Sequence, residues 1–86
     1  GDFYDFFLLD PERLVVSVGD ICGKGLPASL FAAIVVTVLR TTVREEAQLA
    51  RAMMRANAIL CRDNAASLFA TLFLGILNLR TGRLEY

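Results

Sequence analysis

The stretch VGDICGKG at residues 18–25 decides the predicted fold and most of the predicted chemistry. An apolar, β-branched run ends here in one carboxylate, Asp20, and the glycines Gly19, Gly23 and Gly25 surround the following bend. This pattern predicts a strand that stops at a carboxylate and a turn in which the backbone can adopt unusual angles. The spacing is neither that of a nucleotide P-loop nor GxGxxG. Two interpretations stay open from these residues alone: an oxygen ligand at a sheet edge, or a tight turn in which Asp20 caps a helix or bonds the loop backbone.

The composition limits the class of protein. The chain has 86 residues, of which 56% are hydrophobic, and its formal net charge is zero. It is at most one small domain or part of a larger one, and so many apolar residues predict a surface that needs a partner. No basic patch points to nucleic acid. The uncharged run at residues 26–39 is shorter than the roughly 20 residues of a membrane span.

The sequence contains no histidine, which excludes a Ser-His-Asp triad, a Cys-His pair and an HExxH zinc site within this chain. Any metal ion would have to bind oxygen ligands, which favours Mg²⁺, Mn²⁺ or Ca²⁺. Cys22 and Cys61 lack CxxC spacing and are interpreted as two buried thiols of a cytoplasmic protein rather than as a disulfide.

The apolar pattern predicts the element order ββααββ. Residues 2–9 and 14–18 predict two strands of an antiparallel hairpin, with a turn at residues 10–13. Pro27 suits the first turn of a helix over residues 26–40, although the β-branched residues 34–38 are also compatible with a strand. After a break at residues 41–46, a second helix is expected over residues 45–64. Residues 67–79 predict a third strand, residues 80–83 a turn and residues 84–86 a fourth strand.

The expected hairpin brings acidic residues from both strands to one end of the sheet. Positions 2–5 pair with positions 18–21, so Asp2, Asp5 and Asp20 are predicted to converge. Three carboxylates so close together repel one another unless a cation neutralises them, which indicates a site for a hard cation. Strict alternation, however, places Asp5 with Phe3 on one face and Asp2 on the other. In a different register the aspartates would be ordinary turn residues that point into water.

Four segments carry a resemblance to a known family: GDFYD at residues 1–5, GDICGKG at 19–25 followed by PAS at 27–29, FATLF at 69–73, and LNLRTGRLEY at 77–86. In this order they resemble the stage II sporulation protein E-like serine phosphatases, a bacterial branch of the metal-dependent (PPM) protein phosphatases. The resemblance implies an α+β fold that is part of an α-β-β-α sandwich. Its antiparallel sheet would carry two helices on one face.

The resemblance also implies a centre with two Mn²⁺ or Mg²⁺ ions, at which activated water hydrolyses phosphoserine or phosphothreonine. Asp2 matches the family's first metal aspartate, and Asp20 matches the bridging aspartate. The backbone carbonyl of Ile21 matches the neighbouring oxygen ligand. Asp5 is interpreted as a further ligand or as a residue just outside the ligand set.

The loop residues Gly23, Lys24 and Gly25 are assigned to shaping the approach of the phosphate or to stabilising the loop. The remaining ligands are expected beyond Tyr86, so residues 1–86 are expected to be the N-terminal portion of one phosphatase domain, inactive by itself. The implied partner is a phosphorylated signalling protein, such as an anti-sigma factor antagonist. The alternative is a non-catalytic, truncated or degenerate module that acts through protein interaction or as a homodimer formed by its exposed apolar surface.

Overall fold

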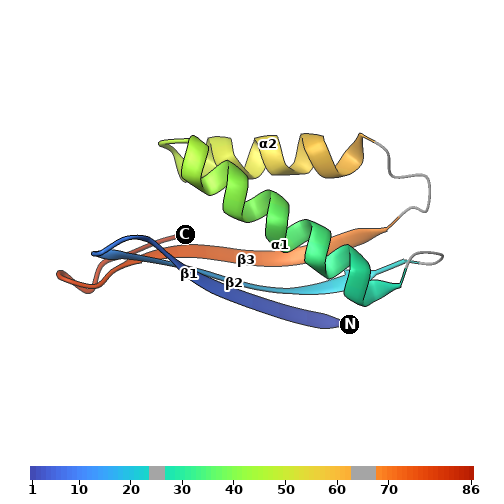
Figure 1. Ribbon diagram of the computed structural model, residues 1–86, viewed down its shortest axis with the longest axis horizontal. Coiled ribbons are helices and arrows are strands. Elements are labelled where there is room, and N and C mark those ends of the chain that lie inside the picture. Colours follow the sequence, from blue (N-terminus) through green and yellow to red (C-terminus); the bar gives the residue numbers. More distant parts are fainter. Residues whose placement is uncertain (24–26, 63–67) are drawn as a thin grey trace.

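The computed structural model describes residues 1–23, 27–62 and 68–86 and contains four strands and two helices in these ranges. The elements follow the order β1 (Asp2–Asp10), β2 (Arg13–Cys22), α1 (Ala28–Glu45), α2 (Leu49–Cys61), β3 (Phe69–Asn78) and β4 (Leu84–Glu85) (Figure 1). The predicted order ββααββ is therefore confirmed. Both helices lie on the same side of the sheet.

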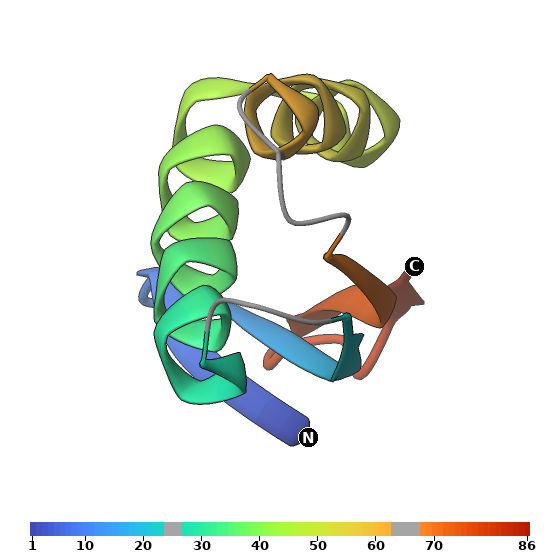
Figure 2. The same ribbon diagram turned by 90° about the vertical axis from the view of Figure 1, so that its right-hand side faces the viewer.

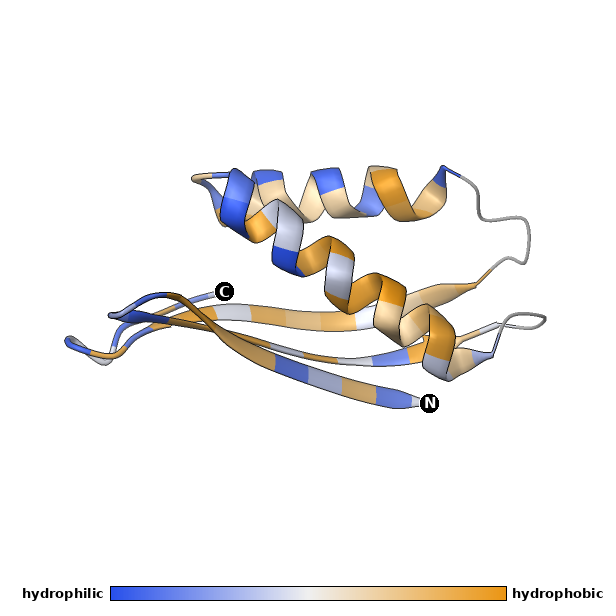
Figure 3. Cartoon of the chain, in the orientation of Figure 1, coloured by the Kyte–Doolittle hydropathy of each residue, from blue (hydrophilic) through white to orange (hydrophobic). Residues whose placement is uncertain are grey.

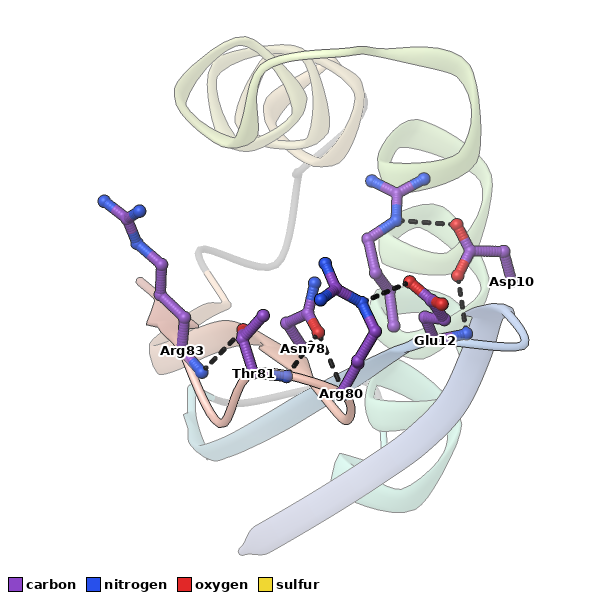
Figure 4. A network of polar contacts seen from close by, with 7 residues as sticks. Asp10, Glu12, Asn78, Arg80, Thr81 and Arg83 are labelled. Atoms are coloured by element: carbon purple, nitrogen blue, oxygen red, sulfur yellow. Dashed lines mark hydrogen bonds and ion pairs between the residues drawn. The ribbon is translucent and has the colours of Figure 1, made fainter.

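The four strands form one sheet in the order β1-β2-β3-β4, and every neighbouring pair is antiparallel. At the first turn, the Asp10 carboxylate accepts hydrogen bonds from the Glu12 backbone N–H at 2.9 Å and from Arg13 Nε at 2.7 Å. At the second turn, the Asn78 side-chain oxygen accepts the backbone N–H groups of Arg80 and Thr81 (Figure 4). These side-chain bonds fix both turns at one end of the sheet, where hydrophilic residues gather (Figure 3).

Helix α1 supplies most of the core between the helices and the sheet. Its buried residues Phe31, Val35 and Leu39 fall at helical spacing and pack with Phe3 and Val15 of the first two strands. Helix α2 packs against α1 and lies farther from the strands (Figure 2). A largely apolar cavity of about 180 Å³ separates α2 from β3.

The predicted break at residues 41–46 is wrong, because α1 continues through Glu45. Thr42 and Val43 are buried, so tertiary packing maintains the helix through this polar stretch. The Thr42 hydroxyl donates to the Leu39 carbonyl oxygen at 3.4 Å, and the Thr41 hydroxyl donates to the Thr37 carbonyl oxygen at 3.0 Å. Threonine hydroxyls bonded back to the preceding turn are compatible with a helix interior.

The second helix begins at Leu49, four residues later than predicted, and its expected end at residues 63–64 lies outside the described residues. The two cysteines are free, as predicted, but the prediction that they are buried is wrong. Both Cys22 and Cys61 are exposed because each lies at the last position of its element. No helix in the described part of the chain combines the length and hydrophobicity needed to cross a membrane.

The two faces of the sheet differ because the helices cover only one of them. The inner face, under the helices, buries Phe3, Val15 and Leu74. On the outer face, Tyr4 pairs with Val18, which in turn pairs with Phe73, and all three side chains are exposed. We refer to this apolar surface as the outer face; it consists of Tyr4, Phe6, Leu8, Val18, Phe73 and Leu84.

Candidate metal centre

The end of the sheet opposite the turns brings two carboxylates together. Asp2 on β1 lies directly across from Asp20 on β2. Gly1 and Ile21, the next pair, exchange both backbone hydrogen bonds at 2.8 and 2.9 Å. Asp2 and Asp20 therefore form a non-hydrogen-bonded pair, the type in which the Cα atoms are only about 4.5 Å apart. The sequence prediction that these two residues meet is confirmed.

Like charges directly opposite each other destabilise a sheet unless something neutralises them. The Gly1 nitrogen lies 2.9 Å from the Ile21 carbonyl oxygen and 3.5 Å from Asp20 Oδ1, so a carboxylate oxygen and the backbone carbonyl predicted as a ligand lie near each other. This oxygen-only donor set fits a hard divalent cation such as Mg²⁺ or Mn²⁺.

Asp5 does not join this group, and the prediction that the three aspartates converge is wrong. Asp5 pairs with Ser17 on the inner face of the sheet, and its side chain is only 14% exposed. Both of its carboxylate oxygens accept hydrogen bonds from the Arg40 guanidinium on α1, at 2.7 and 2.8 Å. These bonds, and the positive charge of Arg40, hold the pKa of Asp5 below its usual range despite the burial that opposes this shift.

The Asp5–Arg40 pair belongs to a structural contact between α1 and β1. The Arg40 guanidinium carbon lies 5.0 Å from the centre of the Phe7 ring, and the corresponding atom of Arg44 lies 4.7 Å from it. Two cation–π contacts and a bidentate ion pair therefore attach the C-terminal half of α1 to β1. Asp5 serves this attachment, and nothing in its geometry directs it to the Asp2–Asp20 pair.

Glycines allow close packing around Asp20. A Cβ on residue 19 would lie 2.5 Å from a ring atom of Phe3 and 2.5 Å from the Thr71 carbonyl oxygen, so no larger residue fits without movement. Gly23 has φ +139°, and a Cβ there would lie 2.8 Å from Cα of Leu68. Gly23 thus shapes the chain directly after β2. Lys24 and Gly25, the other predicted loop residues, lie outside the described residues.

One polar residue beside Asp20 was missed in the sequence. Thr71 on β3 lies directly across from Asp20, on the side away from Asp2. Asp2, Asp20 and Thr71 therefore form a polar row across three strands, next to the apolar row of Tyr4, Val18 and Phe73. The sequence marks Thr71 only as the one polar side chain in the run at residues 68–77, and its place beside Asp20 follows from the register between β2 and β3.

The described residues provide only part of a metal site. Across residues 1–23, 27–62 and 68–86, no three acidic or cysteine side chains group closely enough to hold a metal ion. A larger groove of about 830 Å³ lies at the other end of the sheet, between the turns and the α1–α2 connection. Its charged residues, which include Arg13, Arg44 and Glu46, are remote from the Asp2–Asp20 pair. The candidate metal site therefore does not lie in this larger groove.

The fold recurs in two solved structures. The chain superposes with a TM-score of 0.76 on a structure of the PP2C phosphatase domain and a regulatory-domain fragment of SpoIIE from Bacillus subtilis, at 20% identity over 96% of this chain. The TM-score is 0.78 for the RsbU and RsbW domains of Rv1364c from Mycobacterium tuberculosis, at 26% identity over 98% of this chain. These likenesses show that the four-stranded sheet and its two helices share their fold with part of these two solved chains.

Sequence comparison agrees with the structural class. Residues 10–86 match the family described as stage II sporulation protein E (SpoIIE), and the chain belongs to this family. Protein IcfG from Synechocystis sp. is 28% identical over 113 aligned positions that include the whole chain. The chain spans 18% of IcfG and 24–25% of the two solved chains, so it corresponds to a limited part of each.

Proposed function

We propose that this chain is the N-terminal portion of a metal-dependent protein serine/threonine phosphatase domain. The observation that carries the proposal is the opposition of Asp2 and Asp20, beside the Ile21 carbonyl, in a chain of the SpoIIE family. Two facing carboxylates are unfavourable without a cation, and a cation placed there has oxygen donors on two strands.

In the proposed centre, the side chains of Asp2 and Asp20 and the backbone carbonyl of Ile21 hold Mn²⁺ or Mg²⁺. A pair of such ions, when bound, lowers the pKa of a water molecule and neutralises the oxygens of a phosphoryl group. We assign Asp20, which lies in the middle of the polar row, to contact both ions. Further ligands would come from segments outside residues 1–86.

The outer face supports the same proposal. In an α-β-β-α sandwich, a second sheet would cover Tyr4, Phe6, Val18 and Phe73, and this cover would exclude water from the interior beside the acids. The polar row lies at the edge of this apolar surface, where an ion would be reached from solvent while its ligands rest on a rigid sheet.

The proposed substrate is a phosphoserine or phosphothreonine on a signalling protein of the cytoplasm, such as an anti-sigma factor antagonist. The match to a structure of RsbU and RsbW domains from Mycobacterium tuberculosis supports a place in such regulation. Gly23, Lys24 and Gly25 begin two positions after Ile21, the last proposed metal ligand, and we assign them to the approach of the phosphate or to the stability of the loop.

The test is hydrolysis of a phosphoserine peptide by the full-length protein, with and without Mn²⁺. Asp20→Asn should lower kcat at least about a hundredfold, because it removes half of the facing carboxylate pair. Glu12→Gln is the matched control, since Glu12 is an exposed acid at the opposite end of the sheet. Full activity of Asp20→Asn, or no hydrolysis by the wild type at saturating Mn²⁺, would refute the proposed function.

A second function is favoured by the outer face alone. A non-catalytic module would cover this apolar surface by pairing with a second copy or with another protein. Sedimentation of the chain distinguishes this function: a stable dimer that Phe6→Glu separates into monomers, combined with no metal-dependent hydrolysis by the full-length protein, would favour the module.

A further inference from the structure

Thr71 has a position that the proposed metal ligands do not explain. It is exposed on the outer face, among apolar neighbours on β3, and it lies directly across from Asp20. In the described part of the chain, its hydroxyl has no hydrogen-bond partner. The position of this polar side chain, in an apolar strand and directly opposite a carboxylate, therefore needs an explanation.

The pairing geometry allows a direct contact between these two side chains. Ile21 bonds to β1, and successive residues of a strand direct their backbone groups to opposite sides, so Asp20 bonds to β3. Directly opposed residues have Cβ atoms about 4.5–5.5 Å apart. A threonine hydroxyl is one bond from Cβ and a carboxylate oxygen is two, so a hydrogen bond spans this gap.

The strand spacing at this point is supported by Gly19. The Thr71 carbonyl oxygen would lie 2.5 Å from a Cβ on residue 19, so only glycine lets β3 approach β2 this closely. Thr71 is also β-branched, which restricts its χ1 angle and limits the directions of its hydroxyl. The backbone therefore holds the Thr71 Cβ across from that of Asp20, and rotation about χ1 is what can bring the hydroxyl to the carboxylate.

We propose that Thr71 is a positioning residue for Asp20. When the cation is bound, its hydroxyl would donate a hydrogen bond to the carboxylate oxygen on the β3 side, which would fix the Asp20 side chain with its other oxygen toward Asp2 and the cation. This inference rests on the proposed function, because it assigns Asp20 to a metal. The role resembles that of residues that orient metal ligands elsewhere, whose loss commonly weakens metal binding by about 10- to 100-fold.

The test is Mn²⁺ binding by titration calorimetry to the full-length protein and its variants. Thr71→Val keeps the shape and branching but removes the hydroxyl, and it should weaken Mn²⁺ binding about tenfold or more. Thr71→Ser restores the donor and should bind within about threefold of the wild type. Thr41→Val on α1 is the control, since its hydroxyl bonds only the Thr37 carbonyl oxygen, and it should bind as the wild type does.

The melting temperature without metal separates positioning from folding. Thr71→Val should melt at or above the wild-type temperature, because valine favours strands. Wild-type Mn²⁺ affinity in Thr71→Val, with binding lost in Asp20→Asn, would overturn the role of Thr71 alone. Equal weakening by Thr71→Val and Thr71→Ser would also overturn it. Unchanged binding in Asp20→Asn would instead overturn the proposed metal site, and the role of Thr71 with it.

Discussion

Asp2 and Asp5 lie three residues apart on the same strand, and their surroundings are opposite. Asp5 lies on the inner face, almost buried, with both oxygens bonded to Arg40. Asp2 lies on the outer face, exposed and across from a second carboxylate, Asp20. The first carboxylate is paired with a side chain of the fold, whereas for the second pair we propose a bound metal ion as the partner. The pleat of one strand thus separates a structural acid from a candidate metal ligand.

The same contrast holds for the two faces of the whole sheet. Helix α1 covers the inner face with a packed apolar core, and the outer face presents aromatic and β-branched side chains next to the polar row. Substitutions that differ only in the face they alter therefore test the comparison directly.

The largest expected effect on stability lies on the inner side, at Gly19. Gly19→Ala should lower the free energy of unfolding by about 3 kcal/mol, because the new methyl group meets the Phe3 ring and a backbone oxygen that cannot move independently. Gly75→Ala on the neighbouring strand is the control, since its Cβ would meet the flexible end of Leu84 at 3.1 Å. Chemical denaturation measures both. Equal costs at the two positions would show that β2 and β3 are not held closely at Gly19.

Two valines on β2, one on each face of the sheet, allow the faces to be compared with the same side chain and the same substitution. Val15 is 1% exposed and Val18 is 55% exposed. Val15→Ala should cost about 2 kcal/mol in a denaturation experiment, whereas Val18→Ala in the 86-residue chain should change stability by less than about 0.5 kcal/mol. In the full-length protein the two costs should become similar if a second sheet covers the outer face. A persistent difference there would mean that Val18 stays exposed.

The smallest expected effect is the pH dependence of the Asp5–Arg40 pair. Because the pKa of Asp5 is lower in the folded state than its ordinary value of 3.8, the pair stabilises the fold above that value. The contribution disappears as the pH falls through the folded pKa, below 3.8. The difference in unfolding free energy between wild type and Asp5→Asn should therefore shrink from pH 7 to pH 2.5. A difference that stays constant over this range would contradict the ion pair.

Much of this arrangement was predictable from local patterns. The Asp10 turn and the two apolar runs define the β1–β2 hairpin, and its register brings Asp2 to Asp20. The predicted convergence of Asp5 with Asp2 was inconsistent with the alternation of side chains along β1, which places Asp5 on the opposite face of the sheet from Asp2. Its true partner, Arg40, is 35 residues away and is found only when α1 packs on the sheet.

Other features depended on tertiary packing. The helix continues through Thr42 because burial overrides the weak preference of this segment for a helix. The position of Thr71 beside Asp20 depends on the register between β2 and β3, which are separated in sequence by both helices. A long-range pairing of this kind cannot be obtained from the spacing of residues within one segment.

The central claim is that the metal binds at the Asp2–Asp20 pair. The most direct test is titration calorimetry of Mn²⁺ binding to the full-length protein and to its variants Asp2→Asn, Asp20→Asn and Asp5→Asn. The facing carboxylates predict that Asp2→Asn and Asp20→Asn each weaken binding at least about tenfold, whereas Asp5→Asn remains close to the wild type and loses only stability. Equal binding by all three variants, or the greatest loss in Asp5→Asn, would contradict the assignment of the metal to the Asp2–Asp20 pair.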